Sequence, residues 1–264
     1  PRHLRPFTLT DVRDVTIRNA LFDGDVARGV SARDDGRGFA FGLGVQRSDG
    51  VRVEHSEFRS FLRGLIVSES RNVALIANDL HDLRSDGMDF AQVSGLRIEG
   101  NHLHAFATAQ GTDDHADMIQ IWTNGTTAPS TDIVIRDNVL DAEGRGYTQS
   151  IFLRNDMVDR GKAGREMFYR DITIEGNVII NAHLHGITVG ETVGLRIERN
   201  TLVQDLASRG EANDRPLWVP QIRVSPAAAK VRIARNAVAV ITGFEGQPDW
   251  RLERNVTIQN RTRA

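Results

Sequence analysis

A short phrase recurs along the chain and constrains its fold more than any other feature. Each copy has two aliphatic residues separated by one position, a short polar step, an Asn and another aliphatic residue. Six clear copies carry the Asn at positions Asn78, Asn101, Asn138, Asn177, Asn200 and Asn236, with spacings of 23, 37, 39, 23 and 36 residues. Self-similarity at this period indicates a solenoid, in which each repeat contacts only its neighbours.

A second phrase lies between consecutive copies and alternates aliphatic residues with period two, as in Gly64–Val67, Gly87–Phe90 and Gly186–Val189. Alternation rich in Ile, Val and Thr predicts short β-strands, and helical periodicity is absent. A unit of about 22 residues is too short for a propeller blade of roughly 40. We therefore predict an all-β, parallel β-helix solenoid with coils of about 22 to 23 residues, forming a single domain over residues 1–264.

The recurrent Asn is expected to be structural. Asn tolerates left-handed backbone at a corner, and its amide can bond the same Asn in the next coil, about 4.8 Å away. The longer spacings place extra residues in loops around 105–115, 157–169 and 204–219. We expect these insertions on one side of the solenoid, where they form the walls of a cleft that runs along the fourth to seventh coils.

Composition excludes several classes of protein. The chain has 33 basic and 35 acidic residues, which argues against a nucleic-acid binder that relies on net charge. No apolar run reaches the roughly 18 residues of a membrane span. The absence of Cys excludes disulfides and thiolate chemistry, and only Lys162 and Lys230 are lysines. Nearly all the positive charge is therefore arginine, which pairs well with planar carboxylates.

The coil pattern over nearly the whole chain resembles the right-handed parallel β-helix superfamily of bacterial polysaccharide lyases, uronate epimerases and pectinase-type hydrolases. Ser85–Asp89 resembles a phrase of polygalacturonase-type hydrolases. More loosely, it resembles a phrase of alginate epimerases that continues with Pro and His, where this chain has Phe90 and Ala91. His185–Gly190 is similar to a Gly-His-Gly phrase of the hydrolases. The resemblance implies a polysaccharide substrate, often acidic, lying across one face. We expect a secreted, periplasmic or cell-surface protein whose targeting segment lies outside this chain.

Alternation of the second phrase sends polar and aromatic side chains outward in two neighbouring rows. One row holds Asp89, Gln120, Phe152, Thr188 and Arg223, and the other holds Ala91, Trp122, Arg154, Gly190 and Ser225. Members of a row lie about 4.8 Å apart, which is contact distance for a bound sugar. The phrase from Asp113 to Trp122 is the richest, because His115 and Asp117 precede Gln120 and an indole ring that can stack on a pyranose.

Carboxylates supply one set of candidate catalytic groups. Asp86, Asp89, Asp114 and Asp117 belong to consecutive coils, so a pair within about 5 to 10 Å, as glycoside hydrolysis requires, is expected. The same oxygens suit a Ca²⁺ ion that holds a uronate carboxylate. Asp and Gly at a coil corner are equally consistent with turn chemistry, so the spacing alone leaves these alternatives open.

Histidines supply the other set. His183 and His185 point the same way, and an imidazole from either, or from His115, can abstract the proton beside a sugar carboxylate. Arg154 and Gln120 are expected to neutralise that carboxylate. The two neighbouring histidines also suit a metal site or a stacked corner, and His102 and His104 are expected to be structural. Further predicted substrate contacts are Gln149, Lys162, Arg165, Tyr169 and Arg223.

The leading hypothesis is a lyase or C5-epimerase acting on a uronate-containing glycan. It requires no cofactor, although Ca²⁺ is a candidate, and it expects a monomer with no nucleic-acid or membrane partner. The first alternative is a glycoside hydrolase that uses Asp86 or Asp89 with Asp114 or Asp117. The second is a non-catalytic glycan-binding module, such as a phage or surface adhesin.

Overall fold

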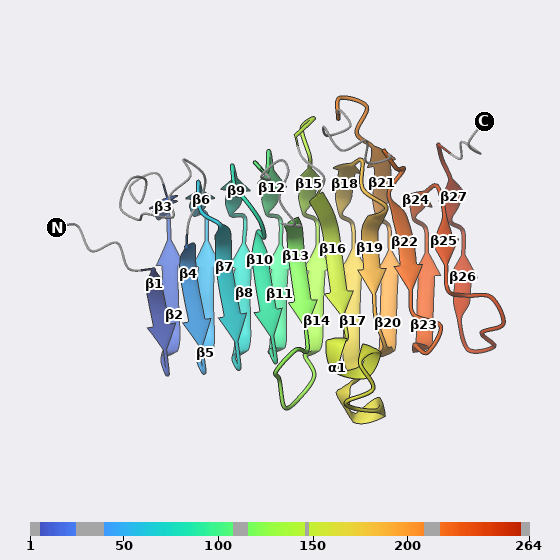
Figure 1. Cartoon of the computed structure of the whole chain (residues 1–264), viewed down its shortest axis with the longest axis horizontal. Helices are drawn as coiled ribbons and strands as arrows, with labels where there is room; N and C mark the ends of the chain where they lie inside the picture. Colours follow the sequence, from blue (N-terminus) through green and yellow to red (C-terminus); the bar gives the residue numbers. More distant parts are fainter. Residues whose placement is uncertain (1–5, 25–39, 108–115, 146–147, 209–216, 260–264) are drawn as a thin grey trace.

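Three parallel sheets of nine strands each run the length of the molecule (Figure 1). The computed structural model describes residues 6–24, 40–107, 116–145, 148–208 and 217–259. Each coil adds one strand to sheet A, then one to sheet B and one to sheet C, and every strand pairs in parallel with the equivalent strand of the next coil. The predicted all-β, parallel β-helix is confirmed.

The strands are short, and their bounds follow the two sequence phrases. Sheet A holds β1 (Phe7–Thr10), β4 (Phe41–Gln46), β7 (Arg63–Ser68), β10 (Met88–Ala91), β13 (Ala116–Trp122), β16 (Thr148–Arg154), β19 (His185–Val189), β22 (Gln221–Val224) and β25 (Ile241–Thr242). Sheet B holds β2 (Arg13–Arg18), β5 (Asp49–Glu54), β8 (Arg71–Ile76), β11 (Ser94–Glu99), β14 (Thr131–Arg136), β17 (Tyr169–Glu175), β20 (Thr192–Glu198), β23 (Ala229–Ala234) and β26 (Arg251–Glu253). Sheet C holds β3 (Leu21–Asp23), β6 (Glu57–Arg59), β9 (Asp79–His81), β12 (His102–His104), β15 (Val139–Asp141), β18 (Val178–Asn181), β21 (Thr201–Gln204), β24 (Ala237–Val238) and β27 (Val256–Thr257).

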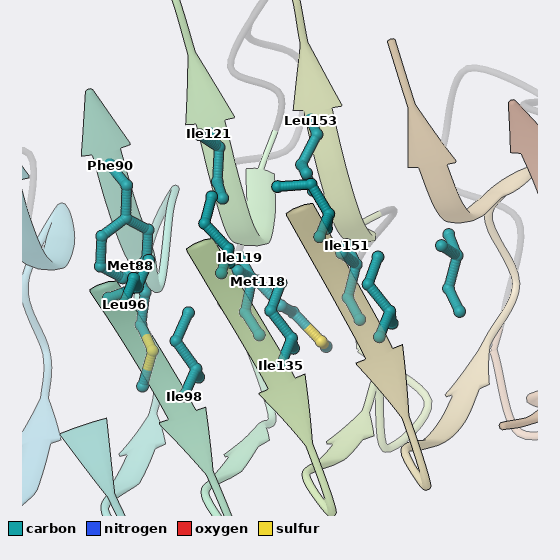
Figure 2. Packing of buried hydrophobic residues seen from close by; sticks show 14 of the residues in the cluster. Met88, Phe90, Leu96, Ile98, Met118, Ile119, Ile121, Ile135, Ile151 and Leu153 are labelled. Carbon is teal, nitrogen blue, oxygen red and sulfur yellow. The ribbon is translucent and has the colours of Figure 1, made fainter. Parts of the chain in front are cut away.

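The core is a column of aliphatic side chains stacked from coil to coil. Met88, Ile119 and Ile151 occupy equivalent register positions on sheet A and are fully buried. Figure 2 shows them facing side chains of sheet B such as Leu96 and Ile135 across the interior. The inward positions predicted from alternation are thereby confirmed, because each pleat puts every second side chain on the same face.

The Asn ladder is also confirmed, with one correction. Asn101 donates its backbone N–H and its amide to Asn138 Oδ1, both at 2.9 Å, and Asn138 does the same to Asn177 Oδ1 at 3.1 and 2.9 Å. The left-handed residue, however, is the one before each Asn, as at Asp137 (φ 57°) and Gly176 (φ 68°). That turn directs the following Asn side chain into the interior, where the amide of Asn138 also reaches Ile98 O at 3.0 Å.

Insertions leave the coils at both borders of sheet A, whereas we expected them on one side. Residues 105–115 and 205–220 connect sheet C strands to sheet A strands. Residues 155–168 connect β16 to β17 at the opposite border and include the short helices α1 (Asp156–Asp159) and η2 (Arg165–Met167). Sheet A is therefore the one face flanked by long connections at both strand ends. Within the described residues, neither helix has the length and apolarity to cross a membrane.

Candidate functional site

A polar stripe crosses the outer face of sheet A along the solenoid axis. The register pairs Asp89 with Gln120, Gln120 with Phe152, Phe152 with Thr188 and Thr188 with Arg223, as predicted from the alternation. A parallel row near the strand starts pairs Asp117 with Gln149 and His185 with Gln221. Neighbours in each row are about 4.8 Å apart, so residues distant in sequence meet on one surface.

Three carboxylates gather at the first coils of this stripe. Asp86 is buried, and Asp89 and Asp117 are fully buried. Arg63 Nε lies 3.1 Å from Asp86 Oδ2 and 3.5 Å from Asp89 Oδ2. Asp86 Oδ1 also accepts the backbone N–H of Asp117 at 3.1 Å, so the group is held as a unit.

The carboxylates have unequal environments. Burial and the neighbouring Asp86 charge raise the pKa of Asp89 well above its usual range, although Arg63 opposes this shift. Neither oxygen of Asp89 has a hydrogen-bond partner among the described residues. Gln120 donates its amide to Asp117 Oδ2. A carboxyl whose raised pKa favours the protonated form, beside two further carboxyl groups, is the arrangement of an acid–base pair, but Asp89 and Asp117 are covered and do not meet solvent.

Histidines and aromatic groups occupy the same stripe three coils further on. The backbone N–H of His185 donates to His183 Nδ1 at 3.0 Å, and His185 Nδ1 lies 2.8 Å from Thr188 Oγ1. Phe152 meets the His185 ring edge-on, with centroids 5.1 Å apart. The Thr188 contact fixes the imidazole ring of His185 through Nδ1 and leaves Nε2 as the ring nitrogen available to a ligand.

The electrostatic environment keeps His185 neutral. Burial, with a smaller contribution from the Arg223 charge, lowers the pKa of His185 from 6.5 to about 4. Arg223 donates to Gln221 Oε1 at 3.3 Å, and within the described ranges no ion pair joins it to a carboxylate. A neutral imidazole therefore lies beside a guanidinium that forms no ion pair with any described carboxylate.

These groups line an open groove of about 530 Å³ on the outer face of sheet A. Phe152, His185, Thr188 and Arg223 form part of its floor. Arg154 borders it, but its Nε is 3.0 Å from Asp159 Oδ2 and 3.5 Å from Asp156 Oδ1. Its charge is balanced by the α1 helix, so Arg223 is better placed than Arg154 to receive a substrate carboxylate.

A larger groove of about 740 Å³ follows the corner between sheets A and B from Asp11 in the first coil to Arg170 after the sixth strand of sheet A. Its lining includes the ion pairs Arg47–Asp11 and Arg71–Asp49, each at 2.9 Å, and it contains none of the predicted site residues. No histidine lines it. The smaller groove on sheet A is therefore the candidate site, because it combines a neutral base, a cation and an aromatic surface.

Comparison with known proteins bears on the fold. A family model described as the right-handed beta helix region matches residues 7–205. The chain belongs to the right-handed β-helix family. Among solved structures, it is similar to an alginate lyase from Paenibacillus sp. str. FPU-7, with 11% identity, a TM-score of 0.37, and coverage of 97% of this chain and 94% of that one. No curated protein sequence gives a significant match.

Several predicted site residues of this β-helix protein are not among the groove residues that the structure describes. Asp114 and His115 are outside the described residues. Lys162 and Arg165 are exposed on the segment between β16 and β17. Trp122 is partly exposed in register with Arg154, and the buried Gln149 Oε1 has no hydrogen-bond partner in the described part of the chain.

The prediction that Tyr169 contacts substrate is wrong. The side chain is fully buried, and its hydroxyl donates to Arg154 O at 2.7 Å, with Ile121 O at 3.2 Å. Burial raises the pKa of this hydroxyl well above its usual range. Tyr169, at the start of β17, therefore joins the two ends of the β16–β17 insertion through its hydrogen bond to Arg154 O.

Two residues of the site were missed by the sequence reasoning. Arg63 begins β7, one coil before the carboxylates, and extending the strand alignment by that coil would have found it. Asn181 Oδ1 accepts the backbone N–H groups of Ala182 at 2.7 Å and His183 at 3.2 Å. Its amide donates to Ser150 Oγ at 2.7 Å, so it positions the histidine segment. No sequence signal separates it from an ordinary corner Asn.

A Ca²⁺ ion on the carboxylates stays a prediction. Across the described residues, three convergent ligand atoms from His, Asp or Glu occur on sheet C and not at Asp86, Asp89 and Asp117. Arg63 supplies positive charge against Asp86 and Asp89. The structure therefore gives this cluster a cation of its own.

Proposed function

We propose that this protein is a polysaccharide lyase or C5-epimerase that acts on a uronate-containing glycan bound across sheet A. The observation that carries the proposal is the neutral His185 beside Arg223 in the sheet A groove. Both reactions begin with removal of the proton on the sugar carbon next to the carboxylate. They need a base that is unprotonated at neutral pH and a cation that stabilises the enediolate.

His185 is the proposed base. The role requires the tautomer in which Nδ1–H donates to Thr188 Oγ1, which leaves a lone pair on Nε2. Nε2 takes the proton from carbon, and in elimination the electron pair forms a carbon–carbon double bond as the bond to the glycosidic oxygen breaks. The imidazolium can then give its proton to the departing oxygen. In epimerisation a proton from solvent adds to the same carbon from the other face, and the imidazolium gives its proton back to water.

Arg223 and Phe152 are the proposed substrate contacts. Arg223 pairs in register with Thr188, one coil beyond the Thr188–His185 contact, so its guanidinium can hold a uronate carboxylate beside the base. Phe152 is partly exposed in the same row and offers an apolar surface to a pyranose ring. Gln120 continues the row toward the carboxylates.

The product test separates the mechanisms. A panel of uronate glycans, including alginate and polygalacturonate, is incubated with the protein. Elimination is read from the ultraviolet absorbance of an unsaturated uronate, and epimerisation from deuterium uptake at the sugar carbon in heavy water. His185→Gln is expected to abolish either signal, and Arg223→Gln to reduce it mainly through KM. The matched control His55→Gln alters an exposed histidine on sheet B's border and should retain full activity.

The carboxylate cluster supports a second candidate, a glycoside hydrolase. Asp89 favours the protonated form, and Asp86 and Asp117 lie against it. Such a set provides an acid and a base for an oxocarbenium-like transition state. Reducing ends formed without unsaturated product, and lost in Asp89→Asn but not in His185→Gln, would establish hydrolysis and reject the lyase proposal. Binding with no turnover in any variant would indicate an adhesin-like module.

A further inference from the structure

Three side chains on the outer face of sheet C bring metal-ligand atoms close together. His102 and His104 alternate on β12, so both point outward, and Asp79 on β9 is the register partner of His102. One ligand atom from each of Asp79, His102 and His104 lies within 4.8 Å of the other two. This place is on a different sheet from the groove that holds His185.

The separations suit a small ion. Asp79 Oδ1 lies 3.0 Å from His104 Nε2 and 3.8 Å from His102 Nδ1. Donor atoms about 2.0 to 2.1 Å from a tetrahedral ion are about 3.3 Å from one another, between these two values. From these positions we propose that Asp79, His102 and His104 bind one divalent transition-metal ion of the zinc type.

The donor set selects the class of ion. Two imidazoles and one carboxylate suit Zn²⁺, Co²⁺ or Ni²⁺, whereas Ca²⁺ and Mg²⁺ take oxygen ligands almost alone. The Asp79 and His102 side chains are 50% and 44% exposed, so an ion can enter from solvent. Three protein ligands leave a coordination position open for water or a ligand oxygen.

Neighbouring groups support the arrangement. Glu143 Oε1 lies 3.1 Å from His104 Nδ1, on the far side of the ring from Asp79. That Nδ1 is buried and lacks an aligned hydrogen-bond partner among the residues described. A metal on Nε2 would fix the Nδ1–H tautomer, and a small rotation of Glu143 would then complete a carboxylate–histidine–metal chain.

His81 stays outside the ligand set although it lies on the same surface. Its ring stacks on His104 with centroids 5.2 Å apart, but Nδ1 contacts Asp82 at 2.7 Å and Nε2 contacts Glu57 at 3.2 Å. The rings of His102 and His104 are themselves stacked, 4.0 Å apart and 12° from parallel. Because the rings are nearly parallel, His102 and His104 can bind one ion together only after one ring rotates. Metal binding is therefore expected to separate the two stacked rings.

The test uses the untagged full chain, because a polyhistidine tag would itself bind metal. Titration calorimetry with Zn²⁺ is expected to show one ion per chain, and Ca²⁺ at the same concentration no binding. Asp79→Asn, His102→Gln and His104→Gln should each weaken binding by about 100-fold, and Glu143→Gln by about tenfold, in line with the loss of an outer-shell partner. The control His55→Gln should bind as wild type.

Co²⁺ provides a readout that does not depend on the variants folding. The wild-type complex should show the intense visible absorption of a four-coordinate ion, and Zn²⁺ should displace it. The proposal is overturned if wild type binds no ion, if the bound Co²⁺ is six-coordinate like the hydrated ion, or if folded variants bind as tightly as wild type. The last outcome would place the ion elsewhere on the chain.

Discussion

The pKa of His185 shows how the neighbouring coils determine the chemistry of one side chain. His185 lies in a row of outward residues, yet Phe152 on the preceding coil and the His183 ring partly bury it. Arg223 on the following coil adds positive charge. Both effects disfavour the imidazolium, so a residue that ordinarily titrates near neutrality becomes a base that is unprotonated in weak acid.

This environment predicts a pH dependence of stability. The pKa of His185 is lowered from 6.5 to about 4, so between these values the unfolded chain binds the extra proton and stability falls as the pH drops. Above pH 6.5 the residue contributes no such dependence. The unfolding free energy of His185→Gln should therefore fall less than that of wild type over this window. Nuclear magnetic resonance should place the ring's titration near pH 4; a midpoint near 6.5 would contradict the burial argument.

Residue-level chemistry was only partly predictable from sequence. Alternation correctly placed Asp89, Gln120 and Arg223 in one outward row, because the pleat is a local property. The prediction failed at Tyr169, which was assigned to the exposed insertion with Lys162 and Arg165. Asp171, two residues on, has a left-handed backbone (φ 56°), which interrupts the pleat before the aliphatic run of β17. The side chain therefore turns inward, although its neighbours in sequence belong to an exposed insertion.

At the scale of the strand and its corner, the Asn ladder is the main polar element of the interior. Asn138 is fully buried and engages Asn101, Asn177 and the carbonyl of Ile98. Every coil from Asn78 to Asn255 repeats this pattern. The sequence predicts the ladder because identical residues stack on themselves in a parallel solenoid. It does not predict which of two consecutive corner residues takes the left-handed turn, because Asn itself tolerates that backbone and the residue before it varies from Gly and Asp to Ala and Arg.

Asn138→Ala is expected to lower the free energy of unfolding by about 3 kcal/mol or more. The substitution leaves the N–H and amide of Asn101 without their acceptor and the carbonyl of Ile98 without its donor, and each orphaned buried group costs about 1 to 3 kcal/mol. Urea unfolding followed by circular dichroism measures the change. Asn124→Ala is the control, since Asn124 is exposed and should matter by about 0.5 kcal/mol or less. Equal effects of the two substitutions would mean that the ladder does not stabilise the stack.

At the scale of the whole molecule, the solenoid brings residues that are distant in sequence into one linear row on sheet A. Gln120, Phe152, Thr188 and Arg223 are register partners on four successive coils. Their strands β13, β16, β19 and β22 follow one another along the solenoid (Figure 1). Because each step is about 4.8 Å, the row from Gln120 to Arg223 spans about 14 Å. The length of the row was accessible from the repeat alone. The loops beside the row were less predictable, because the spacing of the repeats gives the length of an insertion but not how its residues lie over the sheet.

The array predicts that turnover depends on substrate length. A glycan lying along the row needs about three to four rings to reach from Arg223 to Gln120, so kcat/KM for uronate oligosaccharides should rise up to about that length and then level off. Gln120→Ala should remove the gain for long substrates and leave the shortest cleaved substrate unaffected, because only long chains reach Gln120. Arg97→Ala is the matched control, since Arg97 lies on sheet B and pairs with Asp132. A rate independent of chain length, or an equal loss on short and long substrates in Gln120→Ala, would show that the glycan does not follow the axis of the solenoid.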